Sequence, residues 1–166
     1  MHAQEPVTDR LARLEAVAAI KALKHRYLRA CDAKDPVGFR AAFVADGAVL
    51  DYGDRIGRFE GADALVGVFE AIALRRVDGR YAVLDMHHAL HADIEVVGAT
   101  EATGRWTLRF RQVDLVAQVE RVSAIEYDDG YLVEDGEWRI ARSAVTTLWT
   151  LEQPLAEGFA VSGSLL

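Results

Sequence analysis

Residues 134–140 are Glu-Asp-Gly-Glu-Trp-Arg-Ile, and they contain the clearest turn signal of the chain. An Asp-Gly pair suits a two-residue hairpin turn, because both turn positions need a positive φ angle. Segments rich in β-branched and aromatic residues lie on either side, at 117–133 and 137–151. The sequence therefore predicts two long antiparallel strands joined at Asp135-Gly136.

Two further segments of the same kind precede this hairpin, at 84–97 and 103–113. Short turn sequences separate them, at residues 97–99 and 114–115. Consecutive strands with short connections pair antiparallel, so the second half of the chain predicts a four-stranded meander.

The first part of the chain has the periodicity of a helix. Residues 11–31 contain no Gly or Pro, and the cap-type residues Thr8 and Asp9 precede them. Apolar side chains recur at steps of three and four, which is one helical face: Leu14, Val17, Ile20, Leu23, Tyr27 and Cys31. Basic residues are expected on the opposite, solvent-facing side: Arg10, Arg13, Lys21 and Lys24.

Two more helices are expected, at 36–44 with Asp35 as its cap, and at 62–75. A strand at 48–52 and a turn or short strand at 56–59 lie between them. Helices at the N-terminal end followed by a meander predict an α+β fold, in which the helices cover one face of a curved sheet.

Composition limits the possible functions. The chain has 166 residues, 51% of them hydrophobic, which fits one domain spanning residues 1–166. Its net charge of −7, without a run of Lys or Arg, argues against nucleic-acid and anionic-membrane partners. A single cysteine, Cys31, excludes an internal disulfide. Without a visible secretion signal or a long apolar run, a soluble cytoplasmic protein is expected.

Three stretches resemble a known family. They are His25-Arg26-Tyr27-Leu28-Arg29-Ala30-Cys31-Asp32-Ala33-Lys34-Asp35, Met86-His87-His88-Ala89-Leu90-His91-Ala92-Asp93-Ile94, and the hairpin at 134–140. Together they resemble the SnoaL-like branch of the NTF2-like superfamily over about residues 8–151, followed by a tail at 152–166. The resemblance implies a cone in which a curved antiparallel sheet wraps around three N-terminal helices, with a pocket between sheet and helices. The family has catalytic and non-catalytic members, so its fold does not determine function.

Within that branch, the matching positions look like those of scytalone dehydratase, bile-acid 7α-dehydratase and hexachlorocyclohexane dehydrochlorinase, which are cofactor-independent lyases. The resemblance makes Asp32 and His87 an acid–base pair, Tyr27 a catalytic tyrosine and Tyr52 a pocket residue. The sequence also departs from scytalone dehydratase: Cys31 stands at a Tyr position, Gln112 replaces a second His, and Tyr127 stands at an Asn position. The substrate and the leaving group therefore do not transfer.

The chemistry of these residue types is consistent with that role. An isolated imidazole titrates near pH ~6.5, and a carboxylate partner fixes one tautomer and stabilises the imidazolium. His87 is thus a candidate general base and Asp32 its orienting partner. Asp32 falls at a predicted helix C-terminus, where the helix dipole disfavours an anion; the alternative is a solvated turn residue. Tyr27 is a candidate proton donor, or alternatively a core aromatic, because it lies on the apolar helix face.

Other residues are candidates for substrate binding, with a purely structural core role as the alternative: Tyr52, Tyr127, Trp106, Phe69, Phe110 and Gln112. Strand alternation would put His87 and His91 on one face and His88 on the other. A third ligand is missing, so no metal site is predicted. Glycine-rich phosphate loops are absent from the sequence, and no cofactor is expected.

These observations favour a cofactor-independent lyase, a dehydratase or a related elimination or C–C cleavage enzyme. Its substrate would be a small hydrophobic, aromatic or polycyclic, hydroxylated molecule. One alternative is an isomerase or polyketide cyclase in which Asp32 is the base, as in ketosteroid isomerase. Another is a non-catalytic ligand-binding module.

The tail is too apolar for a free end, because it contains Leu155, Phe159, Val161, Leu165 and Leu166. We expect these residues to be buried over the pocket or in a homotrimer or homodimer interface, with Phe159 near a pocket entrance or interface. Charged residues on the central strands suit a partly polar sheet-to-sheet interface: Arg105, Arg109, Arg111, Glu120 and Arg121.

Overall fold

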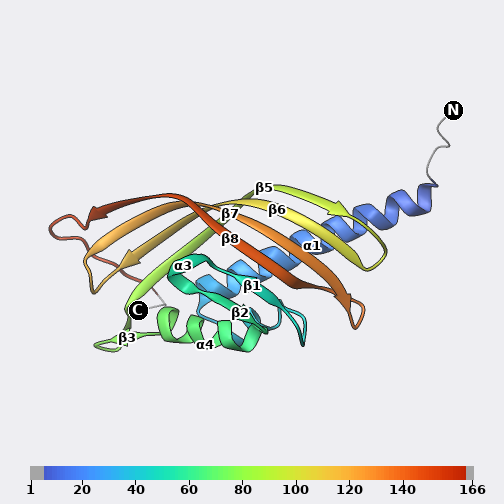
Figure 1. Cartoon of the computed structure of the whole chain (residues 1–166). Helices are drawn as coiled ribbons and strands as arrows, with labels where there is room; N and C mark the ends of the chain where they lie inside the picture. The colour runs from blue at the N-terminus through green and yellow to red at the C-terminus, as the bar shows by residue number, and fades with distance from the viewer. Residues whose placement is uncertain (1–5, 164–166) are drawn as a thin grey trace.

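The structure is a computed structural model that describes residues 6–163. A long arched sheet covers a layer of helices, and the two layers enclose the core (Figure 1). The helices are α1 (Val7–Ala33), α2 (Pro36–Arg40), α3 (Gly53–Ile56) and α4 (Ala62–Ala73). The strands are β1 (Val49–Asp51), β2 (Arg58–Glu60), β3 (Arg76–Val77), β4 (Arg80–Tyr81), β5 (Val83–Val96), β6 (Glu101–Asp114), β7 (Val119–Glu134) and β8 (Glu137–Pro154). This arrangement confirms the predicted α+β fold.

The main sheet has the strand order β2-β1-β8-β7-β6-β5, and β5 to β8 form the predicted antiparallel meander. One pairing differs from the prediction, because β1 lies parallel to β8. Most of the chain separates these two strands, so no tight turn forces them to be antiparallel. β3 and β4 form a separate small hairpin that was not predicted.

The turn between β7 and β8 confirms the Asp-Gly prediction, since Asp135 and Gly136 have φ angles of 52° and 79°. The turn between β6 and β7 is longer than predicted and spans residues 115–118. The Asp114 carboxylate organises it by accepting hydrogen bonds from the main-chain N–H groups of Val116 (3.0 Å) and Ala117 (2.8 Å).

Helix α1 begins at Val7 after Pro6, and no side chain among residues 6–163 caps it, so the predicted Thr8 and Asp9 caps are wrong. Both residues lie inside the first turn instead. The N-terminal end of α1 extends past the sheet (Figure 1), and Leu14 is 66% exposed. The predicted apolar face is buried only from Ile20 onward, where the sheet covers it.

The prediction that Lys24 faces solvent is wrong, because this residue is fully buried. The arched sheet encloses the C-terminal half of α1 on more than one side. A single apolar stripe therefore does not describe which residues are buried there.

Helix α2 begins as predicted, with the Asp35 carboxylate accepting hydrogen bonds from Val37 and Gly38 N–H, both 3.0 Å. It ends at Arg40 rather than at residue 44. The following residues pair with the sheet, since Val44 N–H donates to the Ile140 carbonyl and Ile140 N–H to the Ala42 carbonyl.

The core lies between the concave face of the sheet and helices α1 and α2. Its centre is a group of aromatic rings in which Tyr27 packs on Phe39 and Phe43, with ring centroids 5.3 and 5.6 Å away. Within residues 6–163, no helix combines the length and the apolar character needed to cross a lipid bilayer.

The tail after β8 turns back toward the beginning of β5 (Figure 1). Residues 159–162 line a cavity of about 360 Å³ with Met86, Arg111 and Val113. Phe159 remains 40% exposed, so the single chain does not bury it as predicted. Leu165 and Leu166, which belong to the same prediction, lie outside the described residues.

Candidate active site

The C-terminal turn of α1 and the edge strand β5 bring Asp32 and His87 together, as the sequence predicted. Oδ1 of Asp32 lies 2.5 Å from Nδ1 of the His87 ring. Both carboxylate oxygens also accept the main-chain N–H of His87, at 3.1 and 3.2 Å. The side chains are 28% and 14% exposed, so the pair is sheltered yet accessible.

This geometry selects one tautomer of the neutral imidazole. A carboxylate can only accept, so Nδ1–H donates to Asp32 and Nε2 carries the lone pair that can take a proton. The ring of Phe110 lies 4.6 Å from the His87 ring, centroid to centroid, on the neighbouring strand. The His87 ring is thus oriented by Asp32 on one side and packed against the ring of Phe110 on the other.

A separate group of tyrosines lies deeper. The hydroxyls of Tyr27 and Tyr52 are 2.9 Å apart, and the ring of Tyr127 stands edge-on to Tyr52 at 6.4 Å. Burial, reinforced by their mutual proximity, raises the pKa of Tyr27 and Tyr127, and burial raises that of Tyr52. The three phenols are therefore neutral hydrogen-bond donors at neutral pH.

The predicted trio of Tyr27, Asp32 and His87 does not form one contact cluster. The Tyr27 hydroxyl is bonded to Tyr52, and Tyr27 and Asp32 lie five positions apart along the helix, a rise of about 7.5 Å. Cys31 lies between the two groups, and its thiol contacts Tyr27. Burial raises the pKa of the thiol to about 12, and the negative charge of Asp32 helps to raise it, so it is an inert thiol.

Beneath the tyrosines lies a buried ion pair that sequence reasoning missed. Nζ of Lys24 donates to Asp129 at 2.8 Å and lies 3.5 Å from the centre of the Tyr127 ring. Asp129 also accepts from Tyr131 (2.8 Å) and Ser143 (2.7 Å). Burial, opposed by Asp129, lowers the pKa of Lys24. The available signal was its spacing, four residues after Ile20 and seven before Cys31.

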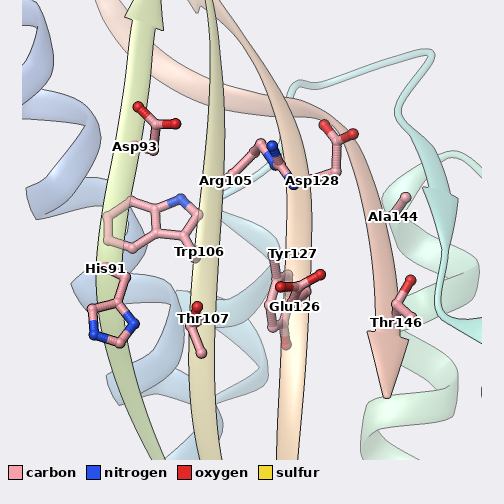
Figure 2. Close-up of a pocket in the computed structure, with 10 residues that line it drawn as sticks. All are labelled: His91, Asp93, Arg105, Trp106, Thr107, Glu126, Tyr127, Asp128, Ala144 and Thr146. Carbon is pink, nitrogen blue, oxygen red and sulfur yellow. The ribbon is translucent and has the colours of Figure 1, made fainter. Parts of the chain in front are cut away.

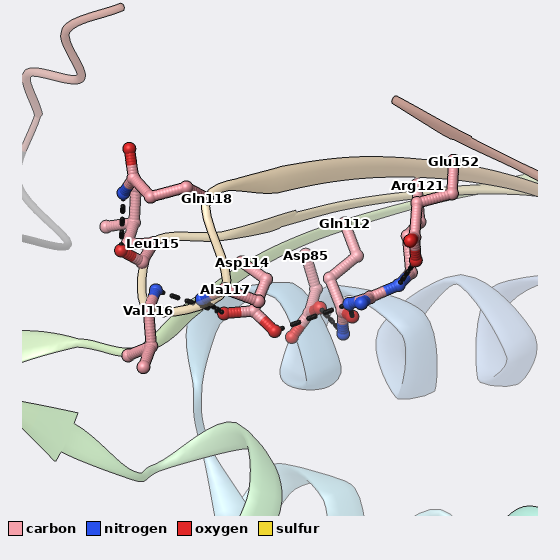
Figure 3. A network of polar contacts seen from close by, with 9 residues as sticks. All are labelled: Asp85, Gln112, Asp114, Leu115, Val116, Ala117, Gln118, Arg121 and Glu152. Carbon is pink, nitrogen blue, oxygen red and sulfur yellow. Dashed lines mark hydrogen bonds and ion pairs between the residues drawn. The ribbon is translucent and has the colours of Figure 1, made fainter. Parts of the chain in front are cut away.

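A second polar network includes Asp85, and Figure 3 shows the part of it that crosses the sheet. Asp85, two residues before His87, is ion-paired with Lys34 and accepts from Nε2 of Gln112 at 3.0 Å. The Gln112 oxygen accepts in turn from Arg121 at 3.3 Å. Both ends of the predicted substrate-binding residue Gln112 are therefore occupied by protein partners. Lys34 was not singled out from the sequence.

The other residues predicted to bind substrate fall into two groups: some are buried in the core, and others are partly exposed at its border. Trp106 is fully packed, and its Nε1–H donates to the Tyr131 hydroxyl at 2.9 Å, so its side chain is part of the core. Phe69 is half-buried and stacks on Phe39 with ring centroids 4.5 Å apart. Phe69, Phe110 and Tyr52 remain partly exposed, and they are the predicted wall residues that a bound molecule can reach.

The predicted shared face of His87 and His91 is wrong. A β-bulge between Leu90 and Asp93, with His91 at a φ of 50°, shifts the alternation and points His91 away from the helices. There it borders a cavity of about 540 Å³ (Figure 2), with mostly polar neighbours: Asp93, Arg105, Trp106, Thr107, Glu126, Tyr127, Asp128, Ala144 and Thr146. Two histidines therefore do not converge on one site.

The chain belongs to the SnoaL-like domain family, which matches residues 12–144. No protein of curated function matches it by sequence. Solved structures with similar folds include a “Putative Scytalone Dehydratase” from Novosphingobium aromaticivorans DSM 12444, at 23% identity and a TM-score of 0.75, covering 90% of this chain and 98% of that one.

Two dehydrochlorinase structures are also similar. Hexachlorocyclohexane dehydrochlorinase LinA-type3 from Novosphingobium barchaimii LL02 is 19% identical, with a TM-score of 0.75 and coverage of 93% and 99% of the two chains. A Type2 LinA is 18% identical, with a TM-score of 0.76 and coverage of 95% and 99%. These likenesses show that the fold is the NTF2-like cone that the sequence implied.

Proposed function

We propose that this protein is a cofactor-independent lyase. It eliminates water or another small leaving group from a small hydrophobic, aromatic or polycyclic, hydroxylated molecule. The observation that carries the proposal is the engagement of the Asp32 carboxylate with both Nδ1 and the main-chain N–H of His87. Two structurally similar proteins whose names denote elimination enzymes support the reaction class.

In this proposal His87 takes a proton from the substrate through Nε2, and Asp32 stabilises the imidazolium that forms. The hydroxyls of Tyr27 and Tyr52 bind each other, so the one that accepts in this bond keeps its proton and assists the leaving group as a donor. Partly exposed aromatic rings at Phe69 and Phe110 favour a flat apolar substrate beside the pair.

The isomerase and cyclase alternative makes Asp32 the base. Both Asp32 oxygens already accept hydrogen bonds from His87, so the carboxylate is directed at the imidazole rather than at a substrate, which favours His87 in that role.

The test is turnover of scytalone, hexachlorocyclohexane and a panel of hydroxylated polycyclic ketones, with products identified by mass spectrometry. For a probe that reacts, His87→Ala is expected to lower kcat by about 100-fold or more. His88→Ala is the matched control, because His88 is the next residue on the same strand and faces away from the helices.

Each outcome is decisive. Wild-type activity in His87→Ala overturns the proposed role of the pair. A product of unchanged mass assigns an isomerase or cyclase instead. Tight binding of the probes without turnover assigns a ligand-binding module.

A further inference from the structure

Helix α1 ends at Ala33, and the residue that caps it, Lys34, is an unusual one. Lys34 adopts the left-handed conformation, with φ 61° and ψ 38°, and its N–H donates to the carbonyls of Ala30 and Cys31. Glycine is the residue favoured at this position, because a side chain there adds conformational strain. The chain nevertheless places a lysine there.

The Lys34 side chain is fully buried rather than extended into solvent. Its ammonium pairs with the Asp85 carboxylate, which is itself 8% exposed, on strand β5. Lys34 lies two residues after Asp32, and Asp85 lies two residues before His87. The Lys34–Asp85 pair and the Asp32–His87 pair therefore join the same two segments of chain side by side.

Asp85 is held in turn by a row of side chains across the sheet. Asp85, Gln112, Arg121 and Glu152 are direct neighbours on β5, β6, β7 and β8. Each contacts the next: Gln112 donates to Asp85 at 3.0 Å, Arg121 to Gln112 at 3.3 Å, and Arg121 to Glu152 at 2.6 Å (Figure 3). Arg121 also reaches Asp114 at 3.3 Å.

We propose that Lys34 is a positioning residue: its buried pair with Asp85 fixes the end of α1 against β5 and thereby holds the Asp32 carboxylate on His87. This inference rests on the proposed function for its catalytic meaning, but the geometry that it predicts is measurable without a substrate. The rival explanation is that Lys34 only ends the helix, with its side chain filling space.

Lys34→Gly separates the two explanations. Glycine suits the left-handed backbone better than lysine, so a simple helix-ending role predicts no loss of order at Asp32. The positioning role predicts that the Asp32–His87 contact is lost although the helix still ends correctly. Asp85→Asn, which keeps the shape and removes the charge, tests the same pair from the β5 side.

Two NMR readouts report the contact directly. One is the downfield resonance of the His87 Nδ1 proton, and the other is hydrogen exchange of the His87 main-chain amide, which also binds Asp32. We expect Lys34→Gly and Lys34→Met/Asp85→Asn to lose the resonance and to speed the exchange by about tenfold or more. The matched control is Lys24→Met/Asp129→Asn, which removes the other buried Lys–Asp pair of α1 and should leave both signals in place.

A sharp resonance and wild-type exchange in both Lys34→Gly and Asp85→Asn would overturn the proposal. Failure of both to fold, while the Lys24→Met/Asp129→Asn control folds, would also count against it, because the pair would then be a general stability element. With a reacting probe, Lys34→Gly should lower kcat more than it changes KM. If no probe reacts, the proposed function fails while the NMR result still decides the positioning role.

Discussion

Lys24 on α1 and Asp129 on β7 form an ion pair from which solvent is fully excluded. Removing two charges from water costs several kcal/mol, which the pair recovers only because Asp129 has two further donors, Tyr131 and Ser143. If one partner of such a pair is removed, the other remains as a buried charge without compensation.

Lys24→Met is therefore expected to destabilise the protein by about 3–5 kcal/mol. Lys24→Met/Asp129→Asn should recover a large part of that loss, because it leaves no lone charge. Urea unfolding of the two variants and the wild type measures both values. A double variant as unstable as the single one would show that packing, rather than the charge, is what the pair contributes.

The tyrosines make stability depend on alkaline pH. Burial is the main cause that raises the pKa of Tyr27, Tyr52, Tyr127 and Tyr131, four of the five tyrosines of the chain. A folded-state pKa above the unfolded value of ~10 leaves stability intact below pH ~10 and lowers it as the pH rises further. Tyrosinate absorbance should therefore develop for these four in one cooperative step that coincides with unfolding. Gradual ionisation of all five while circular dichroism stays native would contradict this.

The sequence identifies some of these residues and not others. Asp32 and His87 are recognisable because their residue types carry acid–base chemistry and the surrounding motifs match a family. Lys24 and Lys34 are not, because helical periodicity sorts residues into one buried and one exposed face. Both lysines are buried only because the sheet arches around the end of α1, and their partners Asp129 and Asp85 lie far along the chain.

At the scale of elements, the hairpin between β7 and β8 depends on the backbone freedom of its turn. Gly136 has a φ of 79°, and an added Cβ would meet nothing within 4 Å, so only conformation opposes a side chain. Gly136→Ala should destabilise the protein by about 1 kcal/mol. Gly67→Ala is the control: it has equally open space but lies in helix α4, where alanine stabilises by roughly 0.5–1 kcal/mol. Thermal unfolding that shifts both variants in the same direction would contradict the argument.

His91 shows where strand alternation fails to predict which face of the sheet a residue occupies. The lengths of β5 to β8 and their order follow from turn residues and β-branched composition, and these were predicted. Alternation then assigns faces correctly only up to a bulge, and no residue type in Leu90-His91-Ala92-Asp93 marks one. One inserted residue exchanges the faces of everything beyond it.

At the scale of the molecule, one part of the outward face of the sheet exposes large apolar side chains among arginines. Two neighbouring rows cross four strands there: Met86, Arg111, Val122 and Leu151, and His88, Arg109, Ala124 and Trp149. Trp149 is 53% exposed and Leu151 66%. Arg121, which the sequence placed in the same interface, instead faces inward to Gln112 and Glu152. The mixture of apolar side chains with arginines suits a second copy of the chain.

The tail lies next to this face, so assembly should depend on it. Its residues 159–162 line a cavity together with Met86 and Arg111, and Phe159 keeps 40% of its surface for a partner. We therefore predict a homotrimer or homodimer that uses this surface.

Deleting the residues after Pro154 should lower the mass measured by light scattering, or the activity, while circular dichroism stays native. Trp149→Lys should act in the same way, whereas Leu14→Lys, at an even more exposed apolar position near the N-terminal end of α1, should leave the mass unchanged. A truncated protein with the original mass and full activity would show that neither the tail nor its neighbouring face takes part in assembly.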